Sequence, residues 1–196
     1  SLSIYRAVGD RLGEGMELAN IGLIYYHLGK FDEAIRFLEN CLQIIHDLGD
    51  LKAVGATLSN LGSVYIEVGD IDKAYKCHIR RLDIAREMGD RQGEGIALAQ
   101  ISSTYLKMPL SDSDSPSNIE WAIKNLEAAL KIFRETGNRS QEATALCNLG
   151  NIFYSKLDET KCIEYYQQAI DIQKEIGDVI GLATTSFNLA GIYLDL

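Results

Sequence analysis

The chain is poor in several features that would identify whole classes of protein. Its 196 residues include only two prolines. Every run of about 18 residues contains a charged side chain, which excludes a membrane-spanning helix. The 19 basic side chains are outnumbered by 28 acidic ones, so the formal net charge is −9. Binding a phosphate backbone requires a concentrated basic face, and a nucleic-acid partner is therefore excluded as well.

The cysteines and histidines lack the spacing of metal ligands or catalytic groups. Four cysteines form no C-x-x-C pair and have no histidine at metal-ligand spacing, so we expect reduced thiols, a cytoplasmic location and no cofactor. His27, His46 and His78 stand apart without a metalloprotease motif or a cysteine partner, and we expect them to be partly exposed helix residues. The sequence therefore predicts that the chain is not an enzyme.

What the sequence does contain is an internal repeat. Gly-Asp recurs at positions 9, 49, 89 and 177, and Gly-Asn stands at position 137, so the steps are 40 residues with one of 48. A second motif keeps the same register, and its first copy is Leu18-x-x-Ile21-Gly22-x-x-Tyr25, followed by a small residue at Ala34. Apolar spacing of this kind predicts two amphipathic helices per unit. Gly is expected to end one helix in the left-handed conformation, and Asp to cap the next.

The repeat predicts an all-α chain of antiparallel helix pairs. First helices are expected at about 11–28, 51–68, 91–107, 139–156 and 179–195, and second helices at about 31–48, 71–88, 118–136 and 159–176. We expect one array over 1–196, with repeats at 10–49, 50–89, 90–137 and 138–177, partial units at 1–9 and 178–196, and a loop insertion at 108–118.

These motifs resemble the tetratricopeptide repeat, whose consensus is W-x2-L-G-x2-Y followed by A-x3-F. The usual period is 34 residues, whereas the period here is 40. This longer form is similar to the LGN/partner-of-Inscuteable class and more distantly to kinesin light chains, and the segment 75–95 carries the similarity most strongly. The resemblance implies a right-handed superhelical solenoid whose first helices line a concave groove. It also implies a scaffold or adaptor for protein–protein interaction that holds a peptide segment in that groove.

In every first helix, a carboxamide stands two residues before the small residue of the motif. These residues are Asn20, Asn60, Gln100, Asn148 and Asn188. A carboxamide both donates and accepts hydrogen bonds, which suits it to hold the backbone of an extended peptide. In tetratricopeptide grooves the matching Asn commonly contacts peptide, so the resemblance implies the same role here. Alternatively, each side chain caps or bridges within its own repeat.

Other positions on the same face are predicted to shape the groove. Leu23, Tyr26, Ser63, Asn151 and Tyr154 are expected to contact the peptide, with the two tyrosines as aromatic anchors. Alternatively, each tyrosine packs against a neighbouring helix.

The charge of the expected ligand follows from what these positions lack. LGN-class repeats often carry Arg four residues before the Asn, but Met16, Ala56 and Ile96 stand there in the first three units. With a net charge of −9, a neutral or basic peptide segment is expected. Cys147 is expected to face the same groove.

Three further hypotheses concern the insertion, the larger protein and the chain ends. Ser111 and Ser115 suit acidophilic and proline-directed kinases, although a tolerated surface loop explains the 108–118 insertion as well. The alternative function is a sensor or regulatory domain of a larger signalling or transcription regulator. The chain begins late in a second helix and ends after a first helix, so we expect open faces that a further repeat or a second copy covers.

Overall fold

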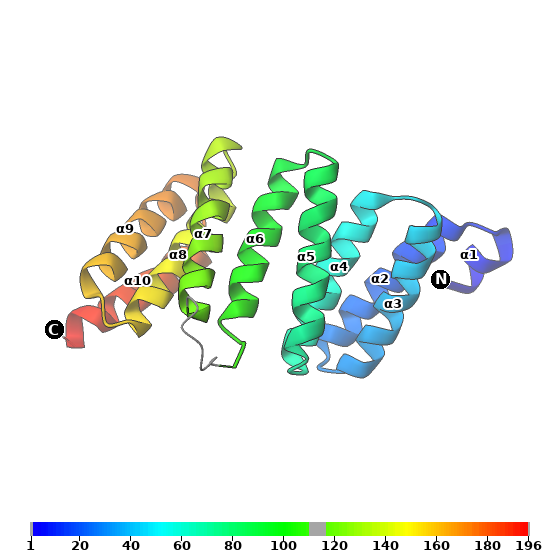
Figure 1. The fold of residues 1–196 in the computed structure, drawn as a ribbon, viewed down its shortest axis with the longest axis horizontal. Helices are drawn as coiled ribbons and strands as arrows, with labels where there is room; N and C mark the ends of the chain where they lie inside the picture. The colour runs from blue at the N-terminus through cyan, green and yellow to red at the C-terminus, as the bar shows by residue number, and fades with distance from the viewer. Residues whose placement is uncertain (1, 110–116, 196) are drawn as a thin grey trace. The chain divides into compact units, whose positions relative to one another are not determined.

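The computed structural model describes residues 2–109 and 117–195, and all its regular structure in these ranges is helical (Figure 1). The chain divides into two compact units, Ser1–Met108 and Pro109–Leu196, at the beginning of the predicted insertion. Residues 110–116, with the Ser111 and Ser115 predictions, lie outside the described residues. Among the helices within the described ranges, none is both long and apolar enough to cross a membrane.

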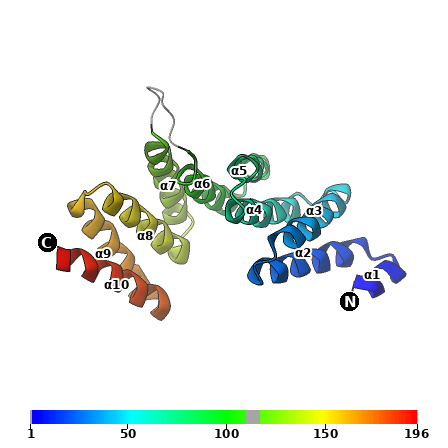
Figure 2. The same ribbon diagram turned by 90° about the horizontal axis from the view of Figure 1, so that it is seen from below.

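Each unit consists of antiparallel helices in which neighbours along the chain pack together (Figures 1 and 2). The first unit contains α1 (Leu2–Val8), α2 (Arg11–His27), α3 (Phe31–Asp47), α4 (Leu51–Glu67), α5 (Ile71–Glu87) and α6 (Arg91–Tyr105). The second contains α7 (Asn118–Glu135), α8 (Arg139–Ser155), α9 (Glu159–Ile176) and α10 (Val179–Asp195). The predicted all-α fold is confirmed, and the helix bounds agree to within about two residues because the repeat motifs mark both ends.

The junctions between helix pairs have the conformation that Gly-Asp predicts. At the junction of α3 and α4, Gly49 has a φ of 72°, and the Asp50 Oδ1 atom accepts from the Ala53 amide at 3.0 Å. The same arrangement recurs at residues 9–10, 89–90, 137–138 and 177–178. Each glycine ends one helix, and each following side chain satisfies an amide that the next helix leaves open.

One junction within a helix pair holds a leucine in the left-handed conformation. Gly29 and Gly69 have φ values of 70° and 79°, and Leu157, at the corresponding place between α8 and α9, has a φ of 58°. A Cβ atom disfavours this conformation, and the Leu157 side chain is 85% exposed, so it contributes little packing. We expect Leu157→Gly to raise the free energy of unfolding by about 1 kcal/mol in urea denaturation.

A matched control for this substitution lies in the first unit. Leu28 is also an exposed helix-ending leucine, but its φ is −84°, which any residue adopts without strain. Leu28→Gly should therefore lower the free energy of unfolding. If both substitutions lower it, Leu157 carries no backbone strain.

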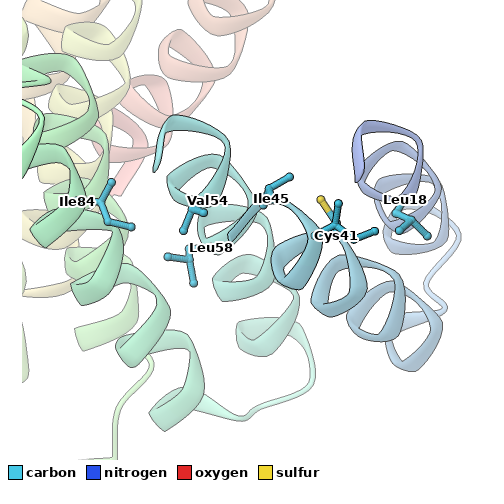
Figure 3. Packing of buried hydrophobic residues seen from close by; sticks show 7 residues of the cluster. Leu18, Cys41, Ile45, Val54, Leu58 and Ile84 are labelled. Carbon is cyan, nitrogen blue, oxygen red and sulfur yellow. The ribbon is translucent and has the colours of Figure 1, made fainter. Parts of the chain in front are cut away.

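The core of the first unit is shared between consecutive helices rather than enclosed within each pair. One buried cluster, shown in Figure 3, contains Leu18 of α2, Cys41 and Ile45 of α3, Val54 and Leu58 of α4, and Ile84 of α5. Each pair thus covers the apolar face of the next, and the stability of the unit depends on the stacking of its pairs.

The small residues of the motif allow the two helices of a pair to approach closely. A Cβ atom on Gly22 would lie 2.7 Å from the Leu38 side chain. In the second pair His78 takes the place of Leu38 above Gly62, and it is only 1% exposed. The expectation of a partly exposed His78 is therefore wrong, because this ring fills a core position that leucine fills elsewhere.

An ion-pair cluster that we did not predict recurs at the beginning of three first helices. In the first, Arg6 Nε lies 2.7 Å and Arg11 Nη1 2.8 Å from the two carboxylate oxygens of Glu14. The other two clusters are Arg86–Glu94–Arg91 and Arg134–Glu142–Arg139. The hydrogen bond from Arg6 lowers the pKa of Glu14, which keeps this carboxylate charged. The signal in the sequence is Arg eight and Arg three residues before each Glu.

Candidate binding surfaces

The carboxamide ladder is open at some positions and occupied at others. Asn20 is exposed, Asn60 and Asn148 are half-buried, and none of these three side chains forms a hydrogen bond with a residue that the structure describes. They lie on α2, α4 and α8, which are first helices of their pairs. The hydrogen-bonding groups of these three carboxamides are thus not used by the residues that the structure describes.

Gln100 of α6 uses both ends of its carboxamide within the first unit. Its Oε1 atom accepts from Arg81 Nη1 at 3.4 Å, and its Nε2 atom donates to Ser59 Oγ. Both partners belong to the preceding repeat, since Ser59 lies on α4 and Arg81 on α5, so Gln100 bridges two repeats instead of capping or bridging within its own.

The other predicted contact residues of the first unit are partly engaged in packing. Tyr26 is half-buried, and its ring centroid lies 6.0 Å from that of Phe31 on α3, as the packing alternative predicts. The Ser63 hydroxyl donates to the Ser59 carbonyl at 3.1 Å, and Leu23 is half-buried on α2.

Three predicted site residues of the second unit meet at one hollow. Asn151 and Tyr154 of α8 and Asn188 of α10 line a cavity of about 300 Å³ together with Tyr166 and Phe187. Phe187 is 80% exposed, so this apolar ring of the cavity lining is open to solvent. The hollow therefore combines a few amide groups with aromatic surface, a composition that is typical of ligand pockets.

Tyr166 of α9 connects the carboxamides of this hollow by hydrogen bonds. Its hydroxyl donates to Asn151 Oδ1 at 2.5 Å, and its side chain also has a hydrogen bond with Asn188. Burial raises the pKa of Tyr166 to about 12, with a smaller opposing effect of the Asn188 bond. The hydroxyl thus stays protonated at neutral pH and orients both carboxamides.

The first unit has a larger open groove between α4 and α6. It has a volume of about 460 Å³, and Ala56 of α4 and Ile96 of α6 line its walls. Each of them stands four residues before a carboxamide of the ladder, where LGN-class repeats often carry Arg. Arg81 of α5 also lines the groove, and burial lowers its pKa while Asp90 opposes the shift.

The Cys147 thiol is held in its protonated form. Burial raises its pKa, although hydrogen bonds with Thr185 and Gln173 oppose the shift, and its Sγ atom lies 3.1 Å from Thr185 Oγ1. A thiol of this kind is a poor nucleophile at neutral pH.

Comparisons with known proteins identify the repeat. Family models described as tetratricopeptide repeat match residues 14–87 and 143–176, which together are more than half of the chain. No curated protein matches the chain in sequence. These matches support no narrower class, and the resemblance to the LGN/partner-of-Inscuteable class is not supported by them.

Solved structures share the fold at low sequence identity. BtubC from P. vanneervenii is 18% identical, with a TM-score of 0.82 over 98% of this chain and 79% of that one. A signal-transduction ATPase with a tetratricopeptide repeat sensor from Pyrococcus horikoshii is 20% identical, with a TM-score of 0.77 over 94% of this chain and 28% of that one. Aspartyl phosphate phosphatase F from Bacillus subtilis is 18% identical, with a TM-score of 0.84 over 95% of this chain and 47% of that one. The chain thus spans less than half of the latter two proteins.

Proposed function

Because this chain belongs to the tetratricopeptide-repeat family, we propose that it is a non-enzymatic scaffold or adaptor module that binds a peptide segment of a partner protein. Within a unit, the peptide lies extended along the first helices, where carboxamides hold its backbone and hollows between helices receive its side chains. The observation that carries this proposal is the set of open carboxamides at one register, Asn20, Asn60 and Asn148.

We further propose that the bound segment is neutral or basic overall and that the module works in the cytoplasm. The net charge of −9 repels an acidic segment over long range and attracts a basic one. All four cysteines are free thiols, which suits a reducing compartment.

Substitution of the open carboxamides tests the proposal. Short random peptides are first selected on the immobilised chain, and their affinities are then measured by fluorescence anisotropy. We expect Asn60→Ala and Asn148→Ala each to weaken binding by about fivefold, because each removes about one hydrogen bond to the peptide backbone. Helix content, measured by circular dichroism, should stay unchanged.

Asn40 provides the matched control. It is an exposed residue of α3, a second helix, and Asn40→Ala should leave every peptide affinity unchanged. Equal affinities for the wild type and both groove variants would contradict the assignment of the groove.

A second candidate function is that of a sensor or regulatory domain within a larger regulator. It is favoured by the similarity to the ATPase whose tetratricopeptide repeats are described as a sensor. The sequence of the complete gene product distinguishes the two functions: an adjoining ATPase or DNA-binding domain favours the sensor, and repeated short binding motifs favour the adaptor.

Self-association through the first and last helices is a further proposal. Ile4 and Val8 of α1 are 61% and 70% exposed, and Val179, Ile180 and Phe187 of α10 are 74%, 82% and 80% exposed. Apolar side chains at this density favour contact with a second apolar face. Sedimentation across a dilution series that shows only monomer would overturn this proposal.

A further inference from the structure

Arg81 occupies a position that small, buried residues fill in the other helix pairs. The corresponding residues are Cys41, Ala129 and Ala169, with exposed fractions of 2%, 0% and 0%. A small residue at this slot lets the second helix pack closely against its neighbours. A long charged side chain departs from this packing rule, and such departures concentrate at functional sites.

The guanidinium of Arg81 is only weakly satisfied by the protein itself. Its one hydrogen bond with a described residue is the 3.4 Å contact with Gln100, and no carboxylate in the described ranges lies within ion-pair distance. Asp90 lines the same groove, but its Oδ1 atom accepts from the Gly93 amide at 2.9 Å as the cap of α6. A half-buried cation with most of its five donors unused is costly unless another group supplies acceptors.

The groove leaves space for such a group. Gly55 and Ala56 on α4 and Gly93 on α6 carry small or no side chains, and Arg81 lies among them. Lys52 adds a second positive charge to the lining of the groove, and Asp90 is the one acidic residue that lines it. The local charge thus favours one anionic group, although the whole chain is acidic.

We propose that Arg81 binds the side-chain carboxylate of an aspartate or glutamate of the peptide in the groove between α4 and α6. This inference rests on the proposed function and adds to it a recognition element. The planar guanidinium donates two parallel hydrogen bonds to a carboxylate, a geometry that a carboxamide side chain does not reproduce. Gln100 positions the guanidinium from the α6 side. The peptide is therefore neutral or basic overall and carries one acidic residue at a defined place.

A positional library of short peptides tests this recognition. The peptides are acetylated and amidated, so that their only carboxylates are side chains, and one position at a time is fixed as Asp, Glu, Asn or Gln. Wild type should prefer an acidic residue over its amide by about tenfold at one position. Arg81→Ala should lose this preference and bind the amide peptides as wild type does.

Two control variants separate recognition from folding. Arg81→Ala introduces the residue that stands at positions 129 and 169, so its free energy of unfolding should be equal to or higher than that of wild type. Arg80→Ala removes an exposed neighbour on α5 and should leave the acidic preference unchanged. Arg81→Lys keeps the charge but loses the paired donors, so it should retain only part of the preference.

The outcomes separate this inference from the proposed function. Peptides that bind wild type without a preference for Asp or Glu would overturn the role of Arg81 and leave the groove assignment standing. A preference that persists in Arg81→Ala would have the same consequence, as would one shown only by peptides with a free carboxyl end. Absence of binding by every peptide would overturn both.

Discussion

Acidification from pH 6.5 to pH 4 is expected to lower the free energy of unfolding by about 3 kcal/mol through His78 alone. Burial lowers the pKa of this imidazole to about 4, and the charge of Arg81 on the same helix acts in the same direction. An unfolded chain protonates the ring near its ordinary pKa of 6.5. The unfolded state therefore binds the proton first, so stability falls as the pH drops below 6.5 and this loss levels off near pH 4.

The contacts of His78 explain why the folded chain excludes the proton. Its Nδ1 atom lies 2.9 Å from Thr104 Oγ1 on α6, and its Nε2 atom is buried without a hydrogen-bond partner among the described residues. The face of the ring toward α4 meets Gly62. A charged imidazolium would thus carry a donor with no acceptor in an apolar place.

His78→Leu is the matched control, because Leu38 and Leu126 stand at the corresponding positions of other pairs. Thr104 keeps a partner in this variant, since its hydroxyl also donates to the Gln100 carbonyl at 2.9 Å. Urea denaturation at several pH values gives the free energy of unfolding as a function of pH. Between pH 6.5 and pH 4, the slope of this dependence should be smaller in the variant than in wild type by the equivalent of nearly one proton. Parallel pH profiles would contradict the origin of the effect.

Gly150→Ala is expected to lower the free energy of unfolding by about 2 kcal/mol. A Cβ atom at this position would lie 2.7 Å from two ring carbons of Tyr166, closer than real contacts permit. Because the Tyr166 ring is buried between α8 and its own helix, it must move for the methyl group to fit. Its hydroxyl bond with Asn151 should be disturbed as well, which links this packing to the hollow of the second unit.

The control is another helical glycine of the second unit, Gly191, which lines the hollow. A Cβ atom on Gly191 of α10 would meet nothing within 4 Å, so Gly191→Ala gains helix propensity without a clash. This variant should unfold at higher urea concentration than wild type, and Gly150→Ala at lower. Similar midpoints for the two variants would show that the packing of Tyr166 against Gly150 accommodates a methyl group.

The candidate site was only partly predictable. The register of the motif placed Asn60 on one first helix, α4, and Asn148 and Asn151 on another, α8, because apolar periodicity marks these helices. It did not find Arg81, since that residue belongs to a second helix and reaches the groove between two first helices. The sequence did contain a signal, because Arg stands at a position of the repeat where the other helix pairs have Ala or Cys.

The sequence by itself determined the helices, their ends and their pairing, because capping by Gly-Asp and apolar periodicity act within a few residues of the chain. Only the tertiary structure decided which polar groups are open. Gln100 is occupied by Ser59 and Arg81, and Asn188 by Tyr166, while Asn60 is not. These partners lie on neighbouring helices, and whether their atoms meet depends on how closely packed side chains bring those helices together.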